Sequence, residues 1–158
     1  AATAVALSLA PREIVATHLA SAGNTFVVVE VSSPDALARA ATPSLERLRA
    51  LGEIAGEGIL VFCRVASDPQ HDLRARMFAP AHGIPEDPAT GSAAVALAGL
   101  LAAAARIDGW HRWRIGQGIE MGRPSLLLAR ARREQGRVVE ARVAGAAVHV
   151  ATGEIEVD

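Results

Sequence analysis

The chain has 158 residues, of which 51% are hydrophobic and 21% charged, with a formal net charge of −1 and one cysteine. That length allows one globular domain with its own core, and the near-neutral charge and 3% aromatic content argue against binding to nucleic acid or an anionic membrane. All 16 basic residues are arginine, so no lysine is present for a pyridoxal phosphate Schiff base or a phosphate-binding P-loop. No apolar run reaches the roughly 20 residues that span a bilayer, and no basic flank marks a signal peptide, so we expect a cytoplasmic protein.

Apolar runs and alternating patterns predict a chain built mostly of short strands with a few helices, which is an α+β fold. The expected strands span residues 14–19, 25–31, 58–65, 73–78, 111–115, 125–131, 138–143, 146–150 and 154–157. The first two strands flank a turn-like segment and predict a hairpin, and the last five predict an antiparallel meander. We expect Cys63 to pack in the third strand as a small hydrophobic residue. Arg74 and Arg76 alternate with apolar residues in the fourth strand, so one face of it should be buried.

Short helices are expected between these strands. Residues 1–9 are apolar and compatible with a helix that Pro11 ends, because proline lacks a backbone donor and restricts the residue before it. Ser33 and Thr42 each precede a proline and predict helix starts, since a hydroxyl can cap free amides and proline suits the first helical position. The second of these helices would present a leucine face made of Leu45, Leu48 and Leu51.

The segment from Ser92 to Ala105 is the most informative element, because it contains no polar residue after Ser92. A helix that is apolar on all sides must be surrounded by other parts of the protein. This one is too short to cross a membrane. We therefore expect a wrapped antiparallel β-barrel around a central apolar helix.

Two carboxylates lie just before this helix, at Glu86 and Asp87. Both are candidates for general acid, general base or orienting roles, since proton transfer needs a group whose pKa the surroundings can tune. Asp87 is the better catalytic candidate because it lies nearer the helix start.

The helix start itself predicts a binding site for an anion. The first backbone amides of a helix lack intrahelical partners and lie at the positive end of the helix dipole. A substrate carboxylate could therefore bind the amides of Gly91, Ser92 and Ala93, with the hydroxyl of Thr90 or Ser92 adding a hydrogen bond. Glycine at position 91 would let the ligand approach the backbone closely.

Other interpretations of the same residues stay open. Asp87 or Thr90 could be a helix cap with no ligand at all. Ser92, Asp87 and His82 are the residue types of a serine hydrolase, but the chain lacks a Gly-x-Ser-x-Gly elbow. His82 and Glu86 lack a second histidine at ligand spacing, so no metal site is expected.

Residues 73–94, including Gly-Ile-Pro-Glu-Asp-Pro-Ala-Thr-Gly-Ser-Ala at 83–93, closely resemble the signature of the PhzF-like (phenazine biosynthesis-like) isomerase family. Two further segments, residues 117–125 and 143–148, extend the resemblance over nearly the whole chain. Members of that family share the diaminopimelate epimerase fold, in which each half is a barrel of strands around a central helix. The resemblance therefore implies the same architecture as the apolar helix.

The resemblance also implies a function. Asp87 would assist proton movement and Gly91 and Ser92 would hold the carboxylate of a small substrate, in an isomerase that uses no cofactor and no metal. Epimerases of the same fold use two cysteines, but Cys63 lies away from the helix start, so that chemistry is not expected.

The family's principal acid/base, a glutamate, and its Gly-His motif belong to the N-terminal half of the enzyme, which has no counterpart in residues 1–158. We therefore expect one C-terminal PhzF-like domain that is inactive alone. Its partner would be the N-terminal half of the same enzyme, or a second copy of the chain in a dimer. The alternative is a non-catalytic module that binds a small carboxylate or another protein.

Overall fold

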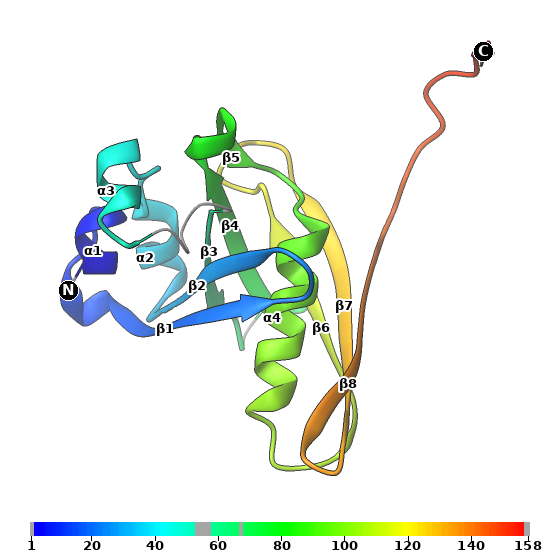
Figure 1. Cartoon of the computed structure of the whole chain (residues 1–158), viewed down its shortest axis with the longest axis horizontal. Coiled ribbons are helices and arrows are strands. Elements are labelled where there is room, and N and C mark those ends of the chain that lie inside the picture. Colours follow the sequence, from blue (N-terminus) through cyan, green and yellow to red (C-terminus); the bar gives the residue numbers. More distant parts are fainter. Residues whose placement is uncertain (1, 53–57, 67, 157–158) are drawn as a thin grey trace.

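The computed structural model describes residues 2–52, 58–66 and 68–156, and within them the strands form one curled sheet (Figure 1). The strands are β1 (Ile14–Ser21), β2 (Thr25–Val31), β3 (Ile59–Arg64), β4 (Leu73–Ala79), β5 (Ile84–Asp87), β6 (Gly109–Gln117), β7 (Ser125–Glu134) and β8 (Arg137–Gly145). Their order in the sheet is β1-β2-β3-β4-β6-β7-β8, and β5 pairs with β4 outside this path. The helices are α1 (Ala2–Ala6), α2 (Pro34–Arg39), α3 (Leu45–Arg49) and α4 (Gly91–Ala103), with single 3₁₀ turns η1 (Pro11–Glu13) and η3 (Pro80–His82).

Helix α4 lies within the curve of the sheet, against β1, β2, β6, β7 and β8 (Figure 1). Its buried residues are small or apolar: Ala93, Ala94, Ala96, Leu97, Ala98 and Ala102. Alanine side chains let the strands approach the helix closely, and the expected central helix is confirmed. Val95, Gly99, Leu100 and Leu101 are only half-buried, so the sheet encloses α4 as a half-barrel and not on all sides.

The sheet is mixed, which corrects the expectation of a purely antiparallel barrel. Strand β2 runs parallel to β3, and β4 runs parallel to β6. Parallel neighbours need a crossover connection, usually a helix. Helices α2 and α3 lie in the connection between β2 and β3, and α4 lies in the connection between β4 and β6.

The central strands are covered on both faces. In β2, Phe26 and Val28 belong to the core around α4, whereas Val27 and Val29 belong to a second core shared with α2, α3 and the segment that follows α1. Cys63 is fully buried in that second core, as expected. We call the two faces of the sheet the α4 side and the α2 side. The expectation that β4 has only one buried face is wrong, because Arg76 on its other face is only 9% exposed.

The helix caps match the sequence in one case and differ in the other. Ser33 caps α2, and its hydroxyl accepts a hydrogen bond from the Ala36 amide (3.1 Å). Thr42 caps no helix, because its hydroxyl donates to the Pro85 carbonyl (3.3 Å). Helix α3 begins after Ser44, whose hydroxyl accepts from the Arg47 amide (3.3 Å). Of the expected leucine face, Leu48 is buried, Leu51 half-buried and Leu45 exposed.

The β1–β2 hairpin and the antiparallel β6–β7–β8 meander are confirmed. The two further strands expected in the tail are not formed: residues 146–156 carry no strand, and Val157 lies outside the described residues. The tail extends away from the sheet (Figure 1). Its apolar side chains Val148, Val150 and Ile155 are each more than 80% exposed. None of the helices in the described part of the chain is long and apolar enough to cross a membrane.

Candidate active site

Glu86 and Asp87 are consecutive residues of β5, and their side chains have different partners on opposite sides of the sheet. Glu86 accepts two hydrogen bonds from the Arg76 guanidinium, from Nε at 2.8 Å and from Nη2 at 2.7 Å. The remaining nitrogen of Arg76, Nη1, donates to the carbonyls of Leu37 (3.2 Å), Ala38 (3.0 Å) and Ala40 (2.7 Å). These carbonyls lie at the end of α2, so Glu86 belongs to the α2 side.

The Arg76–Glu86 pair is a structural connection. Arg76 joins β4, β5 and the end of α2 through charge-assisted hydrogen bonds, and its guanidinium also lies 4.9 Å from the centre of the Phe78 ring. The side chains of Arg76 and Glu86 are only 11% and 13% exposed. A carboxylate held in this way is engaged in the fold and is poorly placed to transfer a proton to a ligand.

Asp87 is connected to the start of α4. The Thr90 hydroxyl donates to Asp87 Oδ2 over 2.6 Å, and the other carboxylate oxygen, Oδ1, is 3.5 Å from the Ala89 amide. Thr90 is the N-cap residue of α4, but its side chain makes no capping hydrogen bond to the helix. The Ala94 amide donates to the Thr90 carbonyl (3.0 Å) in the first turn. The amides of residues 91–93 precede that bond and are the ones that a helix leaves without an intrahelical partner.

The residues that carry these amides differ in exposure. Gly91 is half-buried, Ser92 is exposed and Ala93 is buried. A Cβ atom added at Gly91 would meet only Val143 Cγ1, at an ordinary 3.5 Å, among the described neighbours. The fold therefore does not require glycine at this position, and the missing side chain leaves space beside the first amides of α4.

Gln117 is the site residue to which sequence reasoning assigned no role. Its side chain is 1% exposed, and Nε2 donates to the Asp87 carbonyl (2.7 Å) and to Thr90 Oγ1 (3.1 Å). Its Oε1 accepts from the Thr90 amide (3.4 Å). A polar residue at an inward position of β6, two residues after the buried Ile115, is the signal that could have identified it.

The segment 117–125 packs directly against the loop that carries Asp87. Gly118 has φ +75°, and a Cβ atom there would lie 2.3 Å from the Arg123 carbonyl oxygen and 2.9 Å from that of Pro88. Glycine is needed for this backbone conformation and for this close approach. Two of the three segments that carry the family resemblance, residues 73–94 and 117–125, therefore meet at Asp87 and Thr90.

Neither Cys63 nor a metal-binding cluster of the described residues contributes to this site. Burial raises the pKa of the Cys63 thiol to about 11, so the thiol remains protonated at neutral pH, and it lies in the core on the α2 side. Among the described residues, no group of three or more His, Cys, Asp and Glu side chains could hold a metal ion.

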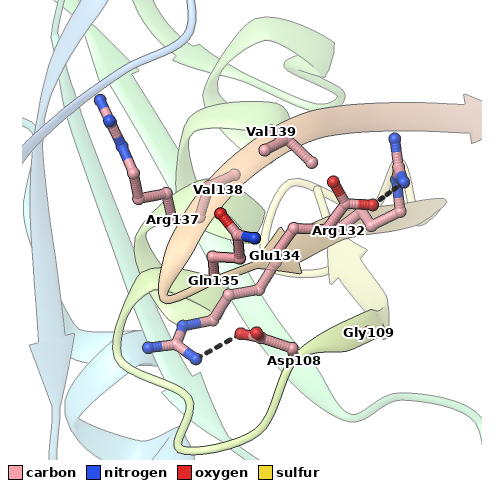
Figure 2. Close-up of a pocket in the computed structure, with 9 residues that line it drawn as sticks. Asp108, Gly109, Arg132, Glu134, Gln135, Arg137, Val138 and Val139 are labelled. Atoms are coloured by element: carbon pink, nitrogen blue, oxygen red, sulfur yellow. Dashed lines mark hydrogen bonds and ion pairs between the residues drawn. The ribbon is translucent and has the colours of Figure 1, made fainter.

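A cavity of about 720 Å³ lies beyond the C-terminal end of α4, between residues 108–109 and the β7–β8 hairpin (Figure 2). Asp108 faces the hairpin there and accepts hydrogen bonds from Arg133 Nη1 (2.7 Å) and the Gly136 amide (3.2 Å). The rise of a 13-residue helix separates this cavity from the first amides of α4 by roughly 20 Å. Asp108 connects the segment after α4 to the β7–β8 hairpin, and this region is distinct from the Asp87 site.

Comparison with known proteins finds a matching family and several relatives. A family model described as "Phenazine biosynthesis-like protein" (PhzC-PhzF) matches residues 1–153. An uncharacterized isomerase of Mesorhizobium japonicum is 36% identical over 158 residues, which cover 95% of this chain and 52% of the relative. The trans-2,3-dihydro-3-hydroxyanthranilate isomerase of Pseudomonas chlororaphis is 45% identical over 82 residues, covering 52% of this chain and 30% of that enzyme.

Solved structures show the same fold. A PhzF-family protein of Bacillus anthracis superposes with a TM-score of 0.81 at 24% identity, covering 98% of this chain and 54% of that one. A predicted epimerase of Pseudomonas aeruginosa gives a TM-score of 0.63 at 23% identity, covering 96% and 51%. The expected diaminopimelate epimerase-like fold is confirmed at this level. The chain spans about half the length of the full-length relatives it matches.

Proposed function

Because the chain belongs to the phenazine biosynthesis-like (PhzC-PhzF) family, we propose that it forms one wall of the active site of an isomerase that moves a proton on a small carboxylated metabolite. The observation that carries this proposal is the position of Asp87, a half-buried carboxylate hydrogen-bonded to the residue that begins α4. An acid/base group and a binding site for an anion are thereby adjacent in the chain.

The substrate carboxylate would accept hydrogen bonds from the amides of Gly91, Ser92 and Ala93 at the positive end of α4. The exposed Ser92 hydroxyl would add a further donor. Asp87 Oδ2 is occupied by Thr90, so Oδ1 is the oxygen that would accept or return the substrate proton. Glu86 would act only through the fold, since Arg76 holds its carboxylate on the α2 side.

The reaction balances without an oxidant or a reductant. A base takes a proton from one carbon of the substrate, the electron pair shifts through the conjugated system, and an acid returns a proton to another carbon. The formula is unchanged, so the protein needs to supply only acid/base groups and binding sites. A second acid/base group would come from the other half of the enzyme or from a second copy of this chain.

The compound to test first is trans-2,3-dihydro-3-hydroxyanthranilate, which is named for three of the relatives. Its isomerisation in D₂O, followed by deuterium uptake, should be measured with the enzyme in which both halves of the fold are present. We expect Asp87→Asn to lower kcat by about 100-fold or more, in line with the usual contribution of a general acid or base. Unchanged turnover in this variant would contradict the proposal. Lost turnover with retained substrate binding would support an enzyme over a binding module.

Binding of the carboxylate has its own test in two glycines of α4. Gly91→Ala should leave stability nearly unchanged, because the added Cβ fits, while weakening binding of benzoate as a simple carboxylate probe. Gly99→Ala is the matched control, since nothing described lies within 4 Å of its Cβ and it lies two turns away. Equal benzoate affinity in all three proteins, measured by NMR titration, would place the carboxylate elsewhere.

A further inference from the structure

The orientation of the Gln117 amide is fixed by two backbone groups. The Asp87 carbonyl can only accept a hydrogen bond, and the Thr90 amide can only donate one. Nε2 must therefore face Asp87 and Oε1 must face Thr90, as the distances of 2.7 Å and 3.4 Å indicate. Exchanging the two ends of the amide would oppose donor to donor and acceptor to acceptor at once.

This orientation decides where the Thr90 hydroxyl proton points. Nε2 of Gln117 lies 3.1 Å from Thr90 Oγ1, and because Nε2 can only donate, the hydroxyl oxygen accepts this bond. Its own proton is then free to point to Asp87 Oδ2, at 2.6 Å. The hydrogen bonds run in one direction, from Gln117 through Thr90 to the Asp87 carboxylate.

The chain of hydrogen bonds has two consequences for the site. It holds the Asp87 side chain by Oδ2, while Oδ1, whose hydrogen bond from the Ala89 amide is a long 3.5 Å, can still accept from the substrate. It also occupies the Thr90 hydroxyl, which makes no capping bond to α4, so the first amides of the helix stay available. Gln117 is well suited to hold this arrangement because it is 1% exposed and lies at the end of β6, between its strand partners Ala75 and Ser125.

We propose that Gln117 is a positioning residue for proton transfer, acting through Thr90 to orient Asp87. This inference rests on the proposed function, since it names the group that holds the proposed acid/base. Gln117 itself would not contact the reacting atoms of the substrate.

The test uses two variants that cannot donate the two Nε2 hydrogen bonds. Gln117→Glu keeps the shape, and Gln117→Met keeps the length without adding charge. Each should lower kcat for trans-2,3-dihydro-3-hydroxyanthranilate by about 10- to 100-fold, the scale expected for a misplaced catalytic group, while KM changes less than about threefold. Gln70→Glu, the same change on an exposed turn residue, is the matched control and should leave kcat unchanged.

A double-mutant cycle separates positioning from general structural damage. Thr90→Val removes the intermediate hydroxyl and should lower kcat by a similar factor, whereas Thr90→Ser should retain it. If Gln117 acts through Thr90, adding Gln117→Glu to Thr90→Val should lower kcat by less than about threefold more. The inference would be overturned if the two single-variant losses in kcat multiply in the double variant. Near-normal kcat in both folded Gln117 variants would overturn it as well.

Two further measurements keep the outcomes distinct. If neither Gln117 variant folds, NMR of the unmodified protein can still test the chain of hydrogen bonds. That chain requires the Thr90 hydroxyl proton to exchange slowly with water, and rapid exchange would overturn the inference. Asp87→Asn is assayed in parallel. Full activity of Asp87→Asn would overturn the proposed function. If Asp87→Asn is inactive but the effects of the Gln117 and Thr90 variants on kcat multiply, only the positioning role is overturned.

Discussion

Glu86 and Asp87 are neighbours in one strand, yet the fold gives them opposite surroundings. Glu86 faces the α2 side, where a buried arginine holds it against the end of a helix. Asp87 faces the α4 side, where Oδ2 accepts from the Thr90 hydroxyl and Oδ1, which accepts a long 3.5 Å hydrogen bond from the Ala89 amide, can still accept from a ligand. A carboxylate in a family signature therefore takes its role from its partners. We expect the Arg76–Glu86 connection on the α2 side to contribute mainly to stability and the α4 side to carry the proposed chemistry.

The largest expected effect tests the structural side. Arg76→Met should destabilise the chain by about 3 to 5 kcal/mol, because it leaves Glu86 as an unpaired buried carboxylate and removes three hydrogen bonds from the end of α2. Denaturant unfolding measures this change. Arg64→Met is the control, since its ion pair with Glu30 is largely exposed on the arginine side and should contribute less than about 1 kcal/mol. Similar losses of unfolding free energy in both variants would mean that the Arg76 connection stabilises the fold no more than an exposed ion pair does.

The second effect is a loss of stability at high pH. Burial raises the pKa of the Cys63 thiol from 9.0 to about 11, so the folded chain keeps a proton that the unfolded chain releases. Stability should therefore fall as pH rises from about 9 to 11, by about 2 kcal/mol at the upper end. The chain has no tyrosine and no lysine to titrate in this interval. Cys63→Ala should remove the decline in unfolding free energy, and an equally steep decline in that variant would contradict the assignment.

A third prediction compares the effect of changing Glu86 with that of changing Asp87. Glu86→Gln keeps the shape but replaces the charge opposite Arg76, and should cost about 1 to 3 kcal/mol of stability. Assayed well below its melting temperature, the variant should keep kcat within about threefold. A loss of turnover as large as that of Asp87→Asn, in a folded protein, would show that the two faces of β5 are not separate in function.

The smallest expected effect on stability belongs to Asp87→Asn. The Thr90 hydroxyl can still donate to the new amide oxygen, and Asp87 is only half-buried, so unfolding free energy should change by less than about 1 kcal/mol. Thermal unfolding beside Glu86→Gln measures the difference. A greater loss of stability in Asp87→Asn than in Glu86→Gln would contradict the structural role assigned to Glu86.

Much of the fold could be predicted from local sequence. The apolar run from Ser92 predicts a central helix because such a helix must be surrounded, and Ser33-Pro34 predicts the start of α2 because its hydroxyl reaches the Ala36 amide. The prediction of further strands in the tail was wrong for a physical reason. Residues 146–150 have the pattern of a strand, but a strand forms only where a neighbouring strand supplies hydrogen bonds, and no strand among the described residues pairs with them.

The sequence by itself determined the hairpin, the meander, the central helix and the residues of the signature, because each depends on chemistry within a few positions. Only the tertiary structure decided which carboxylate faces which side, that Arg76 is buried, and that Gln117 reaches Asp87 and Thr90 from 30 and 27 positions away. Hydrogen bonds between distant segments depend on strand pairing and on crossovers, which periodicity does not record. The acid/base candidate was therefore recognisable in the sequence, but the residues that hold it were not.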